Sequence, residues 1–217
     1  FTSSAGTLSV VAVNKCGSSA SRSATLSFGS IGSAGTVASA NTYTIFNYNA
    51  TGVVFNLPAV TNATSYTWSL SSTATASITS QVSNSCTVSF NGTLGTATTI
   101  TVNCTANGCV NSVAATGLSV QYGGKSTYTS TTTWGGATYG VTSAKVECWG
   151  GGGAGGGSIA NSGTSAYAQG GGGAGGSYAQ STLTVSPATS YTVTVGAAVA
   201  YSAVHNSQVN GNPSWFN

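Results

Sequence analysis

The stretches Cys86-Thr-Val-Ser-Phe90 and Ile100-Thr-Val-Asn-Cys104 decide the fold class of this chain. In both, apolar residues alternate with polar ones, which is the pattern of a strand with one buried face. Similar runs of β-branched and aromatic residues, such as Ser65–Leu70 and Tyr191–Val195, lie between turns of glycine, serine and asparagine. No stretch combines a 3.6-residue apolar period with helix caps. The sequence therefore predicts an all-β protein.

The turn formers Asn91 and Gly92 follow the first of these stretches, so a β-hairpin between the two is expected. In the register of such a hairpin, Cys86 lies directly opposite Cys104. Directly opposed residues have Cβ atoms close enough for a disulfide, and a Cys86–Cys104 bridge is the resulting prediction. The alternative is two buried free thiols in the same core.

Five cysteines without paired histidines favour disulfides over zinc, and therefore a location outside the cytoplasm. The spacing of Cys104 and Cys109 is by itself a weak metal signal. No metal site is expected. Because five is an odd number, at least one cysteine has no partner in the chain. Cys16 is the candidate, with a mate expected upstream of residue 1.

Charged residues make up only 2% of the chain, against about 25% in an average soluble domain. The net charge is +3, and the four cations are spread singly along the chain. No nucleic-acid partner is expected without a basic patch. No run of apolar residues is long enough to span a bilayer, so no direct membrane insertion is expected. The chain is rich in Val, Thr, Tyr and Trp and should fold.

The composition argues against an enzyme, because Glu147 is the only carboxylate side chain and His205 the only imidazole. Glycosidases need two carboxylates and calcium sites need several. The run Gly123-Gly-Lys-Ser-Thr127 has Ser119 where a phosphate loop has its first glycine. The glycine-rich stretches at 150–156 and 170–176 are not followed by the helix and the acidic residue that a dinucleotide-binding site needs. The sequence predicts no cofactor, and His205 is expected to be a turn residue.

An internal repeat relates residues 14–28 to residues 107–120, with a deletion of one residue. Each copy follows a strand rich in Thr and Val. We therefore expect residues 1–28 to be the C-terminal hairpin of a truncated module and residues 31–121 to be a complete module of the same kind. A lone hairpin has too little core to be stable, so upstream sequence or a neighbouring molecule is expected to complete the first module.

The segment Leu57-Pro-Ala-Val-Thr-Asn-Ala-Thr-Ser-Tyr-Thr-Trp68, followed by a strand and an Asn-x-Cys motif, carries a resemblance. It resembles the PKD-like, immunoglobulin-type sandwich repeats of large bacterial surface proteins. The resemblance implies tandem immunoglobulin-like β-sandwich modules with Tyr66 and Trp68 as core aromatics. The early cysteine that would pair with Cys109 in such a module is missing here, and Cys148 is the partner we expect instead.

The second half of the chain contains the string GGGGAGG twice, at Gly150–Gly156 and Gly170–Gly176. Together with the flanking strand segments, the tracts resemble the glycine-rich domain found at the ends of secreted adhesins and in phage tail-tip proteins. The expected domain covers residues 122–217. In that family further glycine-rich sequence follows, so the resemblance implies a domain truncated at its C-terminus.

Glycine tracts have no Cβ atoms, so they can run side by side as extended or polyproline-II-like strands held by backbone hydrogen bonds. The sequence therefore predicts a glycine-rich β domain with packed polyglycine tracts that form a rigid layer. A flexible linker is the alternative. Five aromatic residues are expected either to pack across the tracts or to present a ligand-stacking surface: Trp134, Trp149, Tyr167, Tyr178 and Trp215.

Two classes of function fit these features. The first is a non-enzymatic extracellular structural or adhesive segment of a large bacterial surface or filament-forming protein. Its sandwich modules are spacers, its glycine-rich domain is a packing or adhesive unit, and its partners are other copies of itself or neighbouring modules. The second is a glycan-binding module that uses exposed aromatics, which an exposed aromatic row beside polar amides would favour. Family resemblance alone suggests a third, a passenger segment of a type IX-type secretion substrate that meets a secretion or anchoring machine.

Overall fold

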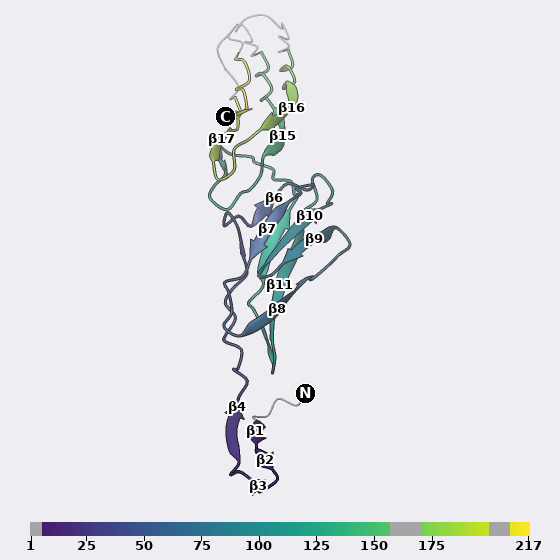
Figure 1. Ribbon diagram of the computed structural model, residues 1–217. Helices are drawn as coiled ribbons and strands as arrows, with labels where there is room; N and C mark the ends of the chain where they lie inside the picture. The colour runs from purple at the N-terminus through teal and green to yellow at the C-terminus, as the bar shows by residue number, and fades with distance from the viewer. Residues whose placement is uncertain (1–5, 157–170, 200–208) are drawn as a thin grey trace, which may run out of the picture. The chain divides into compact units, whose positions relative to one another are not determined.

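The computed structural model describes residues 6–156, 171–199 and 209–217 (Figure 1). All regular structure in these ranges is β strand, which confirms the predicted fold class. The strands are β1 Gly6–Val10, β2 Val13–Asn14, β3 Gly17–Ser18, β4 Arg22–Leu26, β5 Ala38–Ser39, β6 Ile45–Phe46, β7 Val53–Asn56, β8 Ala63–Leu70, β9 Ala76–Val82, β10 Ser85–Phe90, β11 Thr98–Gly108, β12 Ser112–Ala114, β13 Leu118–Tyr122, β14 Thr132–Gly135, β15 Ser143–Trp149, β16 Tyr178–Thr184, β17 Ser190–Thr194 and β18 Trp215–Phe216.

The chain divides into two compact units. The first consists of Phe1–Thr42, Tyr48–Thr93 and Ala97–Gly123, and the second of Tyr43–Asn47, Leu94–Thr96 and Gly124–Asn217.

A sandwich of two antiparallel sheets lies in the first unit (Figure 1). One sheet has the order β5-β7-β10-β9. In the other, β11 pairs with β8, β12 and β13. Both β10 and β11 bury every second residue over most of their length, because each turns one face toward the opposite sheet.

The predicted hairpin between residues 86–90 and 100–104 is wrong. β10 pairs with β7 and β9, whereas β11 pairs with β8, β12 and β13, so the two strands belong to opposite sheets. The buried faces were predicted correctly and the partner strands were not. Alternation fixes which residues face the core, but it is the same whether two strands are neighbours in one sheet or face each other across a sandwich.

Aromatic side chains dominate the core of the sandwich. Tyr122 is fully buried and stacks on Phe90, with ring centroids 4.5 Å apart. Trp68 is buried, and its Nε1–H donates to the carbonyl of Ser83 at 3.3 Å. Tyr66 is half-buried, and its hydroxyl accepts the backbone N–H of Val60 at 2.9 Å.

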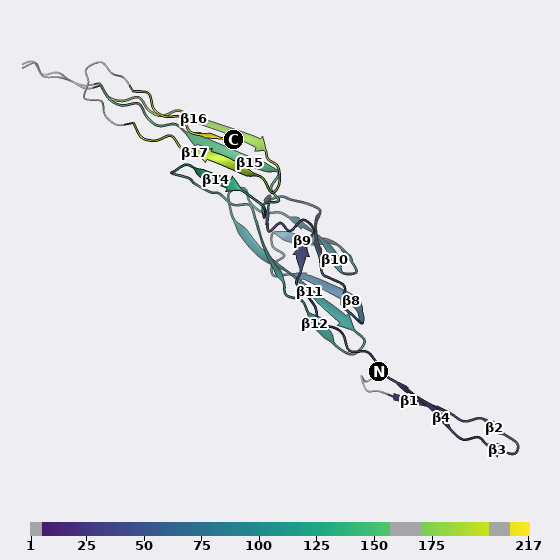
Figure 2. The ribbon, with the colours of Figure 1, turned by 90° about the vertical axis from the view of Figure 1, so that its left-hand side faces the viewer.

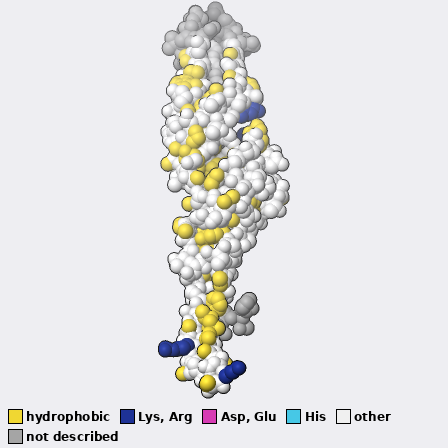
Figure 3. Space-filling model, viewed as in Figure 1, with side chains coloured by type: hydrophobic (Ala, Val, Ile, Leu, Met, Phe, Trp, Pro, Cys, Tyr) yellow, Lys and Arg dark blue, Asp and Glu magenta, His cyan; other side chains and the backbone are white. Residues whose placement is uncertain are grey.

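The N-terminal hairpin is a separate two-stranded ribbon in which β1 pairs with β4 and β2 with β3. Every residue of these strands is exposed. The register places Leu8 and Val10 on one face with Ala24, Leu26 and, at its end, Arg22, while threonines and serines occupy the other face. Figure 3 shows hydrophobic side chains at the surface along this ribbon, whose apolar face is therefore uncovered.

The second unit contains the sheet β14-β17-β18 and the ribbon β15-β16. Trp134 lies in an aromatic cluster with Tyr139, Tyr191 and Phe216, at centroid distances of 5.5, 6.1 and 5.7 Å. Residues 43–47 also belong to this unit, since the backbone N–H groups of Thr44 and Ile45 donate to the carbonyl of Thr138.

Candidate functional site

The first glycine tract donates backbone hydrogen bonds to two neighbouring segments. Its donors to one segment lie at residues 150, 153 and 156, and its donors to the other at residues 151 and 154. The pairs are Gly150 to Ser177 (2.8 Å), Gly153 to Ala174 (3.0 Å), Gly156 to Gly171 (3.0 Å), Gly151 to Asn212 (3.0 Å) and Ala154 to Val209 (3.1 Å). Donors to the same neighbour recur every third residue, which is the period of polyproline II. The tracts are therefore packed side by side, as the sequence predicts.

We call the hydrogen-bonded segments 150–156, 171–177 and 209–212 the glycine layer. At specific positions in this layer the neighbouring backbones lie too close together for a side chain to fit. A Cβ on Gly173 would overlap the carbonyl oxygen of Gly153, and one on Gly176 would overlap that of Gly150. Gly172 and Gly175, in the same tract, face open space. None of these glycines has a positive φ, so the close approach of backbones, rather than an unusual conformation, requires glycine at 173 and 176.

The β15-β16 ribbon leads directly into the glycine layer, because Trp149 precedes Gly150 and Tyr178 follows Ser177. The hydrogen bond from Gly150 to Ser177 continues the ladder of the ribbon. The two strands lie side by side in both ribbon views (Figures 1 and 2). The base of the layer is thus fixed by regular strand pairing.

One face of the ribbon carries aromatic, amide and charged groups, all of them exposed except the half-buried Glu147, and we name it the aromatic face. Its members are opposed pairs in the register: Trp149 and Tyr178, Glu147 and Gln180, Lys145 and Thr182, and Ser143 and Thr184. Trp149 is 60% exposed and Tyr178 is 52% exposed. Their ring centroids lie 5.2 Å apart at an interplanar angle of 45°.

Polar contacts order the groups beside these rings. The Tyr178 hydroxyl donates to Gln180 Oε1 at 2.9 Å, and Lys145 Nζ lies 3.3 Å from Glu147 Oε1. Partial desolvation, followed by the negative charge of Glu147, raises the pKa of the Tyr178 hydroxyl, while Lys145 acts in the opposite direction. The sequence singled out Trp149 and Tyr178 but not Gln180 or Lys145. The two-residue spacing of Lys145, Glu147 and Trp149 along one strand could have placed Lys145 on the same face as Trp149.

The other predicted stacking residues lie elsewhere. Trp134 is half-buried in its aromatic cluster and serves packing. Trp215 is 46% exposed on β18, opposite Thr194. Tyr167 and His205 lie outside the described residues.

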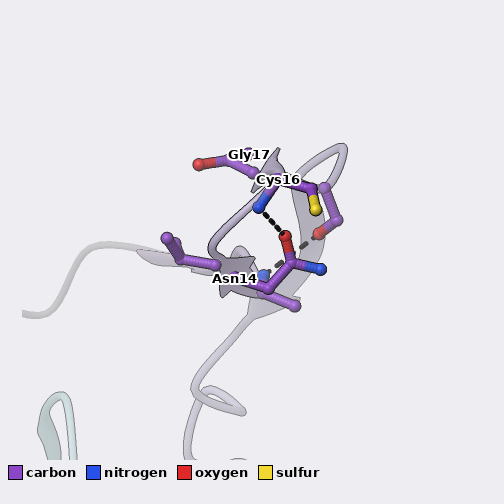
Figure 4. Close-up of a pocket in the computed structure, with 7 residues that line it drawn as sticks. Asn14, Cys16 and Gly17 are labelled. Carbon is purple, nitrogen blue, oxygen red and sulfur yellow. Dashed lines mark hydrogen bonds between the residues drawn. The ribbon is translucent and has the colours of Figure 1, made fainter.

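A hollow at the tip of the N-terminal hairpin is built from the single turn of residues 12–19. Figure 4 shows the Oδ1 of Asn14 in this turn, where it accepts the backbone N–H of Cys16 at 2.8 Å. This contact is a local Asx turn that satisfies the chain's own backbone. The hollow therefore has the features of a turn rather than of a ligand site.

All five cysteines are free thiols in this structure. Cys86 and Cys104 are buried between the two sheets of the sandwich. Trp68 is opposite Cys104 in the β8-β11 register, and its backbone N–H donates to the Oε1 of Gln81 in the other sheet at 3.4 Å. Gln81 is opposite Cys86 in the β9-β10 register. The two cysteines thus lie in the same region of the core, and their disulfide stays a prediction.

Burial raises the pKa of the Cys86 thiol to about 12, with a further contribution from the charge of Cys104, and raises that of Cys104 to about 11. Cys16 and Cys109 are exposed and Cys148 is half-buried. Cys109 belongs to the first unit and Cys148 to the second, and their pairing also stays a prediction.

In the reduced protein, the free energy of unfolding is expected to fall as pH rises above about 9. A folded-state pKa above the unfolded value of 9.0 gives stability that is complete below that value and lost at higher pH. The loss between pH 8 and pH 10 should be about 3 kcal/mol for the two thiols together. Urea unfolding at both pH values measures it, with the double variant Cys86→Ala, Cys104→Ala as control. An equal loss in native chain and variant would contradict the assignment to these thiols.

Within the described ranges, no three His, Cys, Asp or Glu side chains are grouped so that they would hold a metal ion. The same ranges contain no helix long and apolar enough to cross a membrane. Glu147 is paired with Lys145.

Comparison with known protein families gives two matches. Residues 35–120 match the family model of the PKD-like domain, and residues 126–216 match that of a glycine-rich domain. These matches support the predicted domain makeup. The PKD-like match falls on the sandwich and the glycine-rich match on the tracts with their flanking strands. Neither the curated proteins nor the solved structures give a match to this chain.

Proposed function

We propose that this chain is a non-enzymatic extracellular segment of a larger bacterial surface or filament-forming protein. The PKD-like sandwich is the spacer, and the glycine-rich domain is the packing or adhesive unit. PKD-like domains are typically extracellular, which agrees with the disulfide predicted between Cys86 and Cys104.

The observation that carries the proposal is the glycine layer. Its segments are joined backbone to backbone, with carbonyl oxygens where side chains would otherwise lie. Such a layer has few of the side chains from which binding pockets and catalytic sites are built, but its backbones pack closely and hold a fixed shape. These properties suit a structural element.

The low charge of the chain supports packing against further copies. With a net charge of +3 over 217 residues, copies repel each other weakly, and a near-neutral surface favours association. On the face drawn in Figure 3, charged side chains are sparse. The uncovered apolar face of the N-terminal hairpin, with Leu8, Val10 and Leu26 exposed, is the surface we expect a neighbouring copy or module to cover.

The purified chain is expected to self-associate with an affinity that changes less than about twofold between low and high salt. Apolar and backbone contacts are insensitive to screening, and few charges are available to be screened. Sedimentation at increasing protein concentration, with electron microscopy of the assemblies, measures this. A chain that stays monomeric at every concentration, or assemblies that dissolve in moderate salt, would count against the packing role.

A further inference from the structure

In the part of the chain that the structure describes, the aromatic face of the β15-β16 ribbon leaves two large rings largely exposed. Trp149 and Tyr178 keep more than half of their surfaces exposed although they contact each other. Apolar residues of the two strands, Ala144, Val146 and Leu183, lie on the opposite side of the ribbon and are half-buried. The large rings are therefore on the outer side.

The polar groups next to the rings match the hydroxyls of a sugar. The Glu147 and Gln180 pair is two residues from the ring pair, which is about 7 Å along the strand and on the scale of one sugar ring. A carboxylate accepts hydrogen bonds and an amide both donates and accepts them. The hydroxyls of Ser143, Thr182 and Thr184 extend the same row.

The charges on this face favour an uncharged ligand. Glu147 is the only carboxylate side chain of the chain, and it lies 3.3 Å from Lys145, so the pair is locally neutral. An anionic ligand would meet Glu147 and a cationic one would meet Lys145. A neutral pyranose presents an apolar ring face to an aromatic side chain and hydroxyls to the polar row, and it meets no like charge.

We propose that the aromatic face binds a neutral glycan, with a sugar ring stacked on Trp149 and its hydroxyls bonded to Glu147 and Gln180. Tyr178 borders the same ring position and is held by its hydrogen bond to Gln180. The continuous ladder from the ribbon into the glycine layer keeps the face preorganised. The inference rests on the adhesive role proposed above for the glycine-rich domain and names its ligand class.

The test is titration of the full chain with three neutral probes, cellohexaose, maltohexaose and chitohexaose, by calorimetry and by amide NMR. We expect at least one probe to bind, with shifts centred on the amides of residues 145–149 and 178–182. Trp149→Ala should weaken binding by about tenfold or more, because aromatic anchors carry most of the energy of such contacts. Trp149→Tyr should restore most of it, and binding should not depend on salt.

Trp215→Ala is the matched control, since Trp215 is also exposed in the second unit but lies opposite Thr194 rather than opposite a second aromatic ring. It should leave binding unchanged. Glu147→Gln should weaken binding by several-fold while preserving shape. The proposal is overturned if none of the three probes binds, if only charged oligosaccharides bind, or if Trp149→Ala alters self-association and not sugar binding, which would make the face a contact between copies. Because self-association is measured without sugar, failure here leaves the packing role standing.

Discussion

Replacing both Gly173 and Gly176 with alanine is expected to destabilise the second unit by about 4 kcal/mol, since each added methyl overpacks a filled site at about 1–3 kcal/mol. A Cβ at either position overlaps a carbonyl oxygen of the first tract, and that carbonyl is backbone, which cannot rotate away. Relief requires the two tracts to separate, which weakens the hydrogen bonds from Gly153 to Ala174 and from Gly150 to Ser177. Thermal unfolding of the full chain, followed by amide NMR of the second unit, measures the effect.

The double variant Gly172→Ala, Gly175→Ala is the matched control in the same tract. Both positions face open space and neither has a positive φ, so alanine fits there. Alanine at a compatible position reduces the entropy of the unfolded chain, and a gain of about 0.4–1 kcal/mol per site is expected. Equal behaviour of the two double variants would mean that the tracts are a flexible linker instead of a packed layer.

The contrast between these positions also shows what the sequence revealed about the glycine-rich half. Repeated glycines flanked by strands predicted packed tracts, because only glycine allows backbones to approach so closely. The sequence did not reveal which glycines face a neighbour. Gly172 and Gly173 are chemically identical, and the offset between tracts that distinguishes them depends on segments far apart in the chain.

A similar limit applies to the sandwich and to the aromatic face. Alternation predicted that Cys86 and Cys104 face the core, but it did not assign their strands to opposite sheets. Likewise, Glu147 and Trp149 could be placed on one strand face from their spacing. Their opposition to Gln180 and Tyr178 depends on a register across the glycine tracts, and spacing within one strand carries no information about it.

Under oxidising conditions, Cys86 and Cys104 are expected to form a disulfide that stabilises the sandwich by about 3 kcal/mol, the value for a loop of this length. Both side chains are buried between the sheets, and the residues paired with them touch through the contact of Trp68 with Gln81. With oxidised glutathione, each thiol loses its hydrogen and the two sulfurs join by one bond. The glutathione disulfide takes up the two electrons and two protons and leaves as two thiols.

The raised pKa values of these thiols determine when the bond forms. Thiolate is the attacking species, and burial keeps Cys86 and Cys104 protonated near neutral pH. Oxidation of the folded, reduced protein should therefore be slow, and oxidation during refolding should be fast. The mass of the refolded chain, two hydrogens lower, together with urea unfolding with and without reductant, measures both the bond and its stabilisation.

Single variants separate this bond from other cysteine chemistry. Cys86→Ala and Cys104→Ala should each abolish the dependence of the urea midpoint on reductant, whereas Cys16→Ser, at an exposed site in the hairpin, should keep it. If reductant leaves the midpoint of the native chain unchanged, the two thiols stay free in the core. In that case the sandwich depends on the packing of its buried side chains without a covalent bond between the sheets, and the loss of stability at high pH predicted for the reduced protein should then appear in the protein as isolated.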